Sequence, residues 1–65
     1  MTELYYQFIG TEMPLLRQNR NMVQLQKCID LLEKCHNEIS YEFYRGLYGE
    51  LEYIKEQIER KENNG

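Results

Sequence analysis

The sequence predicts an all-α fold: an antiparallel helical hairpin with a short N-terminal helix, dimerising into a helical bundle. The prediction rests on two apolar seams of helical spacing that do not share a phase. The first seam interleaves two sets of residues seven apart: Leu15, Met22, Ile29 and His36, and Gln18, Leu25, Leu32 and Ile39. The second seam contains Tyr44, Leu47, Leu51, Ile54 and Ile58. The register slips by one residue between the two seams, which indicates a turn between two helices or a skip in one long helix.

Residues 3–9 form the first expected element. Thr2 can cap a helix at its start, and Gly10 can end it. The same stretch also has high strand propensity. A helix is favoured because a lone strand would have nothing to pair with in this chain.

A helix over residues 14–36 is expected next, because Pro14 is tolerated in a first helical turn. Its weak point is the stretch Gln18–Asn21, which has no apolar residue and holds two poor helix formers. Asn21 can itself be an N-cap, with Gln24 as the other half of a capping box, so that the helix would consist of two pieces. The continuity of the first seam favours one continuous helix.

The remaining expected elements are a turn over residues 37–40, a helix over 41–61 and a frayed polar tail over 62–65. Asn37 tolerates the left-handed conformation that ends helices. Ser40 is a good N-cap for the following helix. The positions of a hydrophobic staple around this cap are both apolar: Ile39 and Tyr44.

Length and composition predict one small soluble domain. The chain has 65 residues, of which 42% are hydrophobic and 29% charged, with a mean hydropathy of -0.77 and a net charge of -3. It contains no apolar run long enough for a membrane span and no signal peptide, so a cytoplasmic location is expected. A core of this size is marginal. Self-association is therefore favoured, and it would cover an apolar band that is wide for a hairpin: Cys28, Ile29, Leu32, Cys35 and Ile39.

Cys28, Cys35 and His36 are the only candidates for metal binding or nucleophilic chemistry. On one helix the two cysteines would lie roughly 10.5 Å apart, too far for a disulfide. The side chains of Cys35 and His36 diverge by about 100° around a helix, so within one hairpin they cannot converge on a zinc ion or form a Cys–His pair. A dimer in which two copies supply facing ligands is the alternative. We therefore expect no enzyme activity, no metal and no cofactor, and we interpret the cysteines as small buried apolar residues.

A basic stripe is a second candidate site. Arg20, Lys27 and Lys34 are spaced seven apart and would share one outward face of a continuous helix. Such a stripe can contact phosphates of nucleic acid or dock onto an acidic protein. Three exposed cations are few, and the net charge is negative, so a solvated face is the favoured interpretation and nucleic-acid binding is not expected.

The third candidate is a glycine face on the helix over 41–61. Gly46 and Gly49 lie off the apolar seam, and each costs about 1 kcal/mol relative to alanine in a helix interior. Glycine on a helix surface permits close approach of another backbone. The neighbouring residues are of types enriched in protein interfaces: Arg45, Tyr48 and Tyr53. The sequence therefore predicts a partner-binding face, with a kink or a glycine without a role as the alternative.

The segment from Asn37 to Ser40, followed by Phe43 and Tyr44 and by the pair Leu51 and Ile54, resembles the hairpin of the Hha nucleoid regulators. The charged signature of that family is absent after the aromatic pair, where residues 45–49 read Arg-Gly-Leu-Tyr-Gly instead. No functional residue is carried over from this resemblance.

The leading functional hypothesis is a non-enzymatic protein–protein interaction module that regulates, adapts or inhibits a partner protein. One alternative is a small DNA-associated transcriptional or nucleoid regulator that uses the basic stripe. Another is a purely structural homo-oligomer.

Overall fold

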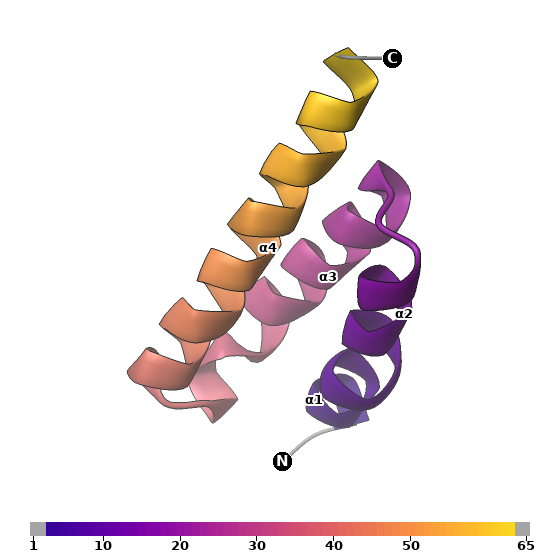
Figure 1. Cartoon of the computed structure of the whole chain (residues 1–65). Helices are drawn as coiled ribbons and strands as arrows, with labels where there is room; N and C mark the ends of the chain where they lie inside the picture. Colours follow the sequence, from indigo (N-terminus) through magenta and orange to yellow (C-terminus); the bar gives the residue numbers. More distant parts are fainter. Residues whose placement is uncertain (1–2, 64–65) are drawn as a thin grey trace.

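The computed structural model describes residues 3–63, which form three helical segments that run in alternating directions (Figure 1). The N-terminal segment consists of α1 (Glu3–Gln7), a π-helical turn (Phe8–Glu12) and α2 (Met13–Gln18). It is followed by α3 (Met22–Cys35), a 3-10 turn (His36–Glu38) and α4 (Tyr41–Asn63). No strand occurs among the described residues, and the predicted all-α class is confirmed.

The N-terminal helix is longer than predicted, because Gly10 does not end it. No described glycine has a positive φ, so Gly10 stays in the right-handed helical region. The chain widens into a π turn in which the Met13 N–H donates to the Phe8 carbonyl. Pro14, which lacks an N–H, follows within the same helix. The predicted cap at Thr2 lies outside the described residues.

The prediction of one helix over residues 14–36 is wrong. The helix breaks after Gln18, where Asn19 and Asn21 leave helical backbone angles. The capping arrangement at Asn21 is confirmed, since the Gln24 N–H donates to the Asn21 side chain over 2.9 Å. A local cap in a stretch without apolar contacts therefore overrides the continuity of the seam.

The turn into α4 is largely as predicted. Ser40 is the N-cap, and its hydroxyl accepts a hydrogen bond from the Phe43 N–H at 3.2 Å. Asn37 was expected in the left-handed conformation, and this is wrong. No described non-glycine residue has a positive φ, and α3 instead tightens into a 3-10 turn at its end. α4 extends to Asn63, two residues beyond its expected end.

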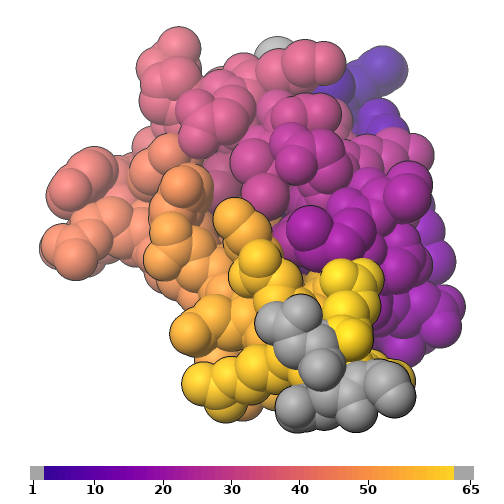
Figure 2. All heavy atoms as spheres, turned by 90° about the horizontal axis from the view of Figure 1, so that it is seen from above, coloured from indigo at the N-terminus to yellow at the C-terminus, as the bar shows by residue number. Residues whose placement is uncertain are grey.

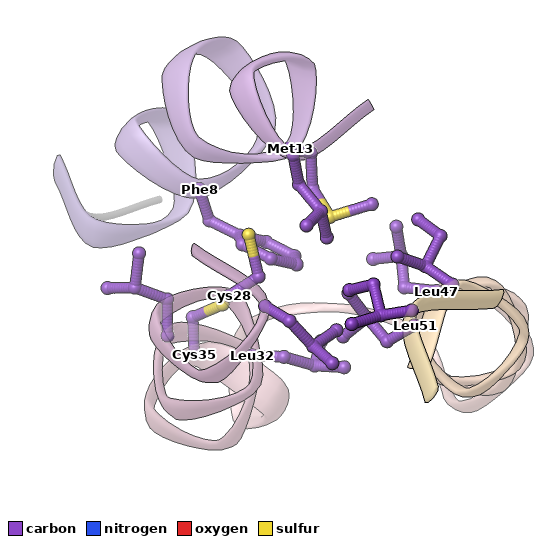
Figure 3. Packing of buried hydrophobic residues seen from close by; sticks show 12 residues of the cluster. Phe8, Met13, Cys28, Leu32, Cys35, Leu47 and Leu51 are labelled. Carbon is purple, nitrogen blue, oxygen red and sulfur yellow. The ribbon is translucent and has the colours of Figure 1, made fainter. Parts of the chain in front are cut away.

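The core is formed by all three helical segments (Figure 3). The N-terminal helix contributes Phe8, Met13 and Leu16, which are fully buried. Figure 3 shows Phe8 and Met13 directed towards the side chains of α3 and α4. The second seam is confirmed. Its residue Tyr44 is half-buried, and its other four residues are buried: Leu47, Leu51, Ile54 and Ile58.

The first seam is only partly right. Leu25 and Leu32 are buried, whereas Leu15 is 42% exposed, Met22 is 40% exposed and His36 is exposed. The remaining buried residues of α3 lie beside the predicted seam: Cys28, Leu31 and Cys35. The cause is the break after Gln18, which lets the N-terminal helix fold back and cover this side of α3. Three residues of the wide apolar band are thus buried within one chain, Cys28, Leu32 and Cys35, while Ile29 and Ile39 are half-buried.

Alanine substitutions at Phe8 and Tyr6 test whether the N-terminal helix packs against α3. Phe8 is fully buried and Tyr6, two residues away, is 63% exposed. We expect Phe8→Ala to lower the free energy of unfolding by about 3–5 kcal/mol, because it leaves a cavity where the helix meets α3. Tyr6→Ala should cost below about 1 kcal/mol. Urea unfolding followed by circular dichroism measures both, and equal losses would contradict this docking.

Candidate functional site

The exposed side of α4 carries the residues of the predicted glycine face. Gly46 and Gly49 are exposed, and a Cβ atom at either position would have no heavy atom of another part of the chain within 4 Å. Tyr53 is 58% exposed, and its hydroxyl accepts a hydrogen bond from the Gln57 side chain at 3.0 Å. The Arg45 guanidinium lies 5.8 Å from the centre of the Tyr41 ring, at the distance of a cation–π contact.

A shallow groove brings three of the five predicted residues together. It has a volume of about 270 Å³ and is lined by residues of α4 alone: Tyr44, Arg45, Tyr48, Gly49 and Glu52. Tyr44 and Tyr48 stack along it with their ring centres 5.9 Å apart. Gly46 and Tyr53 lie on α4 but do not line this groove. We call the exposed surface of Arg45, Gly46, Tyr48, Gly49 and Tyr53 the glycine–aromatic face.

An aromatic row that the sequence did not predict borders this face. The His36 ring, at the end of α3, meets the Tyr44 ring edge-on at 6.0 Å between centres. The Tyr44 hydroxyl donates to the Glu33 carboxylate at 3.0 Å, and this hydrogen bond raises the pKa of Tyr44. The end of α3 therefore holds Tyr44 in place, and Tyr44 in turn supports Tyr48. The four-residue spacing of the two tyrosines beside a short turn was the signal for this arrangement.

The predicted basic stripe is not formed as one face. Arg20 lies in the connection between α2 and α3, where its guanidinium donates a hydrogen bond to the Gln57 side chain of α4. Lys27 lies 3.5 Å from the Glu12 carboxylate. Lys34 is exposed on α3. The helix break thus separates Arg20 from the two lysines, and Lys27 is paired with an acidic residue.

Cys28 and Cys35 are buried free thiols, in agreement with their interpretation as small apolar residues. Burial raises the pKa of both thiols, which keeps them protonated and weakly nucleophilic. His36 is exposed, and its Nδ1 donates to the Glu33 carbonyl at 2.6 Å, whereas Cys35 is buried. Among residues 3–63, no group of three or more histidine, cysteine or acidic side chains is arranged to hold a metal ion.

Glu12 is a buried charged residue at the end of the π turn. Its carboxylate accepts hydrogen bonds from the Gln24 side chain at 2.8 Å and the Gln7 side chain at 3.2 Å. Its carbonyl oxygen accepts from Gln24 at 3.0 Å and from the Cys28 thiol at 3.4 Å. These contacts link the N-terminal helix to α3. The sequence did not predict them, because a glutamate within a helix ordinarily indicates solvent exposure.

The hydrogen bond from Gln24 is the main cause of a lowered Glu12 pKa, with smaller contributions from Gln7 and Lys27. Burial of the carboxylate acts in the opposite direction and is outweighed. A second acidic residue, Glu50 of α4, also has a lowered pKa because it accepts two hydrogen bonds from Arg17, at 2.7 and 3.0 Å. Both carboxylates therefore hold the N-terminal helix against the other two.

No family model, curated protein or solved structure matches this chain. No helix within residues 3–63 combines the length and the apolar character needed to cross a membrane.

The lowered pKa of Glu12 predicts a loss of stability in acid. A carboxyl group with a lower pKa in the folded state stabilises the fold fully above its unfolded pKa of about 4.3, and this contribution is lost as the pH falls through both values. We expect the stability difference between the parent protein and Glu12→Gln to shrink as the pH falls from about 6 to about 3. Urea unfolding at several pH values measures it. Glu59→Gln, which removes the same charge from an exposed position of α4, is the control, and identical curves for the two variants would contradict the role of Glu12.

Proposed function

We propose that this protein is a non-enzymatic interaction module, acting as a regulator, adaptor or inhibitor, whose glycine–aromatic face binds a helix of a partner protein. One observation carries the proposal. Gly46 and Gly49 weaken α4, and the contacts within the described chain give no reason for glycine at either position. A surface that accepts a close backbone from outside would use both glycines.

The chemistry of the surrounding side chains supports a protein as the occupant. α4 carries four exposed aromatic residues, which offer large contact area at low entropic cost: Tyr41, Phe43, Tyr48 and Tyr53. Arg45 adds a charged residue of a type enriched in interface hot spots. The stacking of Tyr44 and Tyr48 and the link from Tyr44 to Glu33 fix part of this surface before a partner arrives.

Charge narrows the class of partner. Between Tyr41 and Glu62, α4 carries six glutamates against four basic residues, a net charge of -2. A helix with lysine or arginine residues flanking a small-residue or apolar stripe would complement this surface. A second copy of the chain offers a similarly acidic α4, so an antiparallel α4–α4 dimer would bring like charges together. We therefore commit to a different protein as the partner.

The glycines predict opposite effects on stability and binding. Gly46→Ala and Gly49→Ala should raise the free energy of unfolding by a few tenths to about 1 kcal/mol, because the backbone angles are helical and the Cβ atoms meet nothing. The same variants should weaken partner binding about tenfold or more, because the methyl groups block close approach. Thermal unfolding measures the first effect. Isothermal titration with the purified partner measures the second.

The partner is identified by placing a photo-crosslinking amino acid at Tyr53, with the same amino acid at Tyr6 as the control. Both tyrosines are exposed to a similar degree, at 58% and 63%, but they lie on different helices. A protein that crosslinks only from position 53 is purified and titrated with each variant. Gly10→Ala is the matched glycine control, since its Cβ atom also meets nothing and it lies outside the proposed face.

Three outcomes would contradict the proposal. Unchanged affinity of the two α4 variants would remove the glycine–aromatic face as the binding site. If Gly10→Ala weakened partner binding as much as Gly46→Ala and Gly49→Ala do, the loss of affinity would reflect helix stability in general and not the glycine–aromatic face. Crosslinking of the chain to itself, with a dimer in sedimentation equilibrium that the α4 variants dissociate, would support the structural homo-oligomer instead.

A further inference from the structure

A second concave surface lies towards the C-terminal end of α4 and adjoins the glycine–aromatic face, since its residue Gln57 donates a hydrogen bond to the Tyr53 hydroxyl. Figure 2 shows this end of the molecule, where the last turns of α4 (yellow) lie beside the connection between α2 and α3 (purple). The hollow has a volume of about 630 Å³. Its lining residues come from the end of α2, from the connection and from α4: Arg17, Gln18, Asn19, Arg20, Asn21, Gln57, Ile58 and Lys61. We call it the cationic groove.

The lining of this groove is basic in a protein that is acidic as a whole. Three of its eight residues are cations and none is acidic, although the chain carries 11 acidic and 8 basic residues. Arg17 is paired with Glu50, which lies outside the lining. Arg20 donates to the neutral Gln57 amide. The hydrogen bond from Arg17 is the main cause of the lowered pKa of Glu50, and the charge of Arg20 is only a minor one. Two cations, Arg20 and Lys61, therefore face the groove in addition to the paired Arg17.

We infer that the cationic groove binds a small ligand that carries two or more phosphate groups. Cations gathered around one hollow repel each other, and a multiply charged anion relieves this repulsion where a neutral ligand cannot. Guanidinium groups match phosphate oxygens in a bidentate geometry. The amide side chains of Gln18, Asn19 and Asn21 line the same hollow and can donate further hydrogen bonds.

The placement of Lys61 alone has a simpler explanation. A cation in the last turn of a helix is favourable beside the negative end of the helix dipole. That role does not account for Arg17 and Arg20, which come from another part of the chain and line the same groove. The helix break at Asn19 to Asn21 is what brings them there.

The size and charge distribution favour a small ligand over nucleic acid. The volume falls within the range of about 300–1,000 Å³ that is typical of small-molecule sites. Nucleic acid would require cations distributed along a path of phosphates. From Arg20 such a path of cations would continue along α3 through Lys27. Lys27 is instead paired with the buried Glu12, so its charge is not free to contact a phosphate.

The test is a titration of the 15N-labelled protein with pyrophosphate at constant ionic strength, followed by amide chemical shifts. We expect saturable shifts confined to residues 17–21 and 57–61. Lys61→Gln and Arg20→Gln should each weaken the affinity about tenfold. Lys34→Gln removes the same charge from an exposed position on α3 and should change the affinity less than about twofold. The same titration with a 12-nucleotide single-stranded DNA distinguishes the sources of phosphate.

Saturable pyrophosphate binding that depends on Lys61 and Arg20 but not on Lys34 supports the inference. Absence of saturable shifts at millimolar pyrophosphate overturns it, as does equal weakening by Lys34→Gln. Binding of the DNA but not of pyrophosphate, with shifts that extend to Lys27 and Lys34, also overturns it and favours nucleic acid. Amide spectra of each free variant check that the fold is retained. Arg20 is linked to the glycine–aromatic face through Gln57, which donates to Tyr53, whereas no hydrogen bond or ion pair within residues 3–63 joins Lys61 to that face. The Lys61→Gln result therefore separates failure of this inference from failure of the proposed function.

Discussion

The whole arrangement depends on the need to cover two sides of α3. One side carries Leu25 and Leu32, and an adjacent side carries Cys28, Leu31 and Cys35. A single neighbouring helix buries one stripe, so a two-helix hairpin would leave the second side in water. The chain solves this by breaking after Gln18 and folding its first helix back onto α3. Burial of Phe8, Met13 and Leu16 is the consequence.

Polar contacts determine how the N-terminal helix sits on this apolar surface. Burial of the Glu12 carboxylate would be costly without partners, but the side chains of Gln24 and Gln7 supply hydrogen bonds to it. Apolar contacts alone tolerate sliding and rotation of a helix, whereas these hydrogen bonds require one position. The π turn belongs to the same arrangement, since Glu12 is its last residue and its carbonyl oxygen also bonds to α3. Arg17 adds a further contact, to Glu50 of α4.

The sequence predicted the features that local chemistry controls. Three features depend only on neighbouring residues and on the helical period: the N-cap at Ser40, the cap at Asn21 and the seam from Leu47 to Ile58. The sequence-based prediction was wrong where contacts between residues far apart in the chain determine the structure, as in the helix expected over residues 14–36. A local cap and an uninterrupted apolar period compete between Gln18 and Met22, and only the tertiary gain from the folded-back helix determines which of them prevails.

The same reasoning explains the candidate sites. The five residues of the glycine–aromatic face lie on one helix, so helical spacing alone predicts that they are exposed on α4, although only three of them line the shallow groove. The cationic groove was not, because Arg17 and Arg20 reach Gln57 and Lys61 only after the chain has reversed direction. Grouping Arg20 with Lys27 and Lys34 followed from a continuous helix that does not exist. A charged residue near a helix break therefore cannot be assigned to a face until the break itself is known.

The two surfaces occupy different parts of α4, and this separation has a structural cause. Neighbouring helices contact only one side of α4, which leaves its first half with an open side around Gly49. Near its end, the connection between α2 and α3 approaches α4 and creates the groove at Lys61. At 1.5 Å per residue, the 12 residues between these two positions span about 18 Å. The two surfaces nevertheless adjoin, because the Gln57 side chain of the cationic groove donates a hydrogen bond to the Tyr53 hydroxyl of the glycine–aromatic face and accepts one from Arg20. A ligand that moved Arg20 or Gln57 would therefore alter a contact that holds Tyr53.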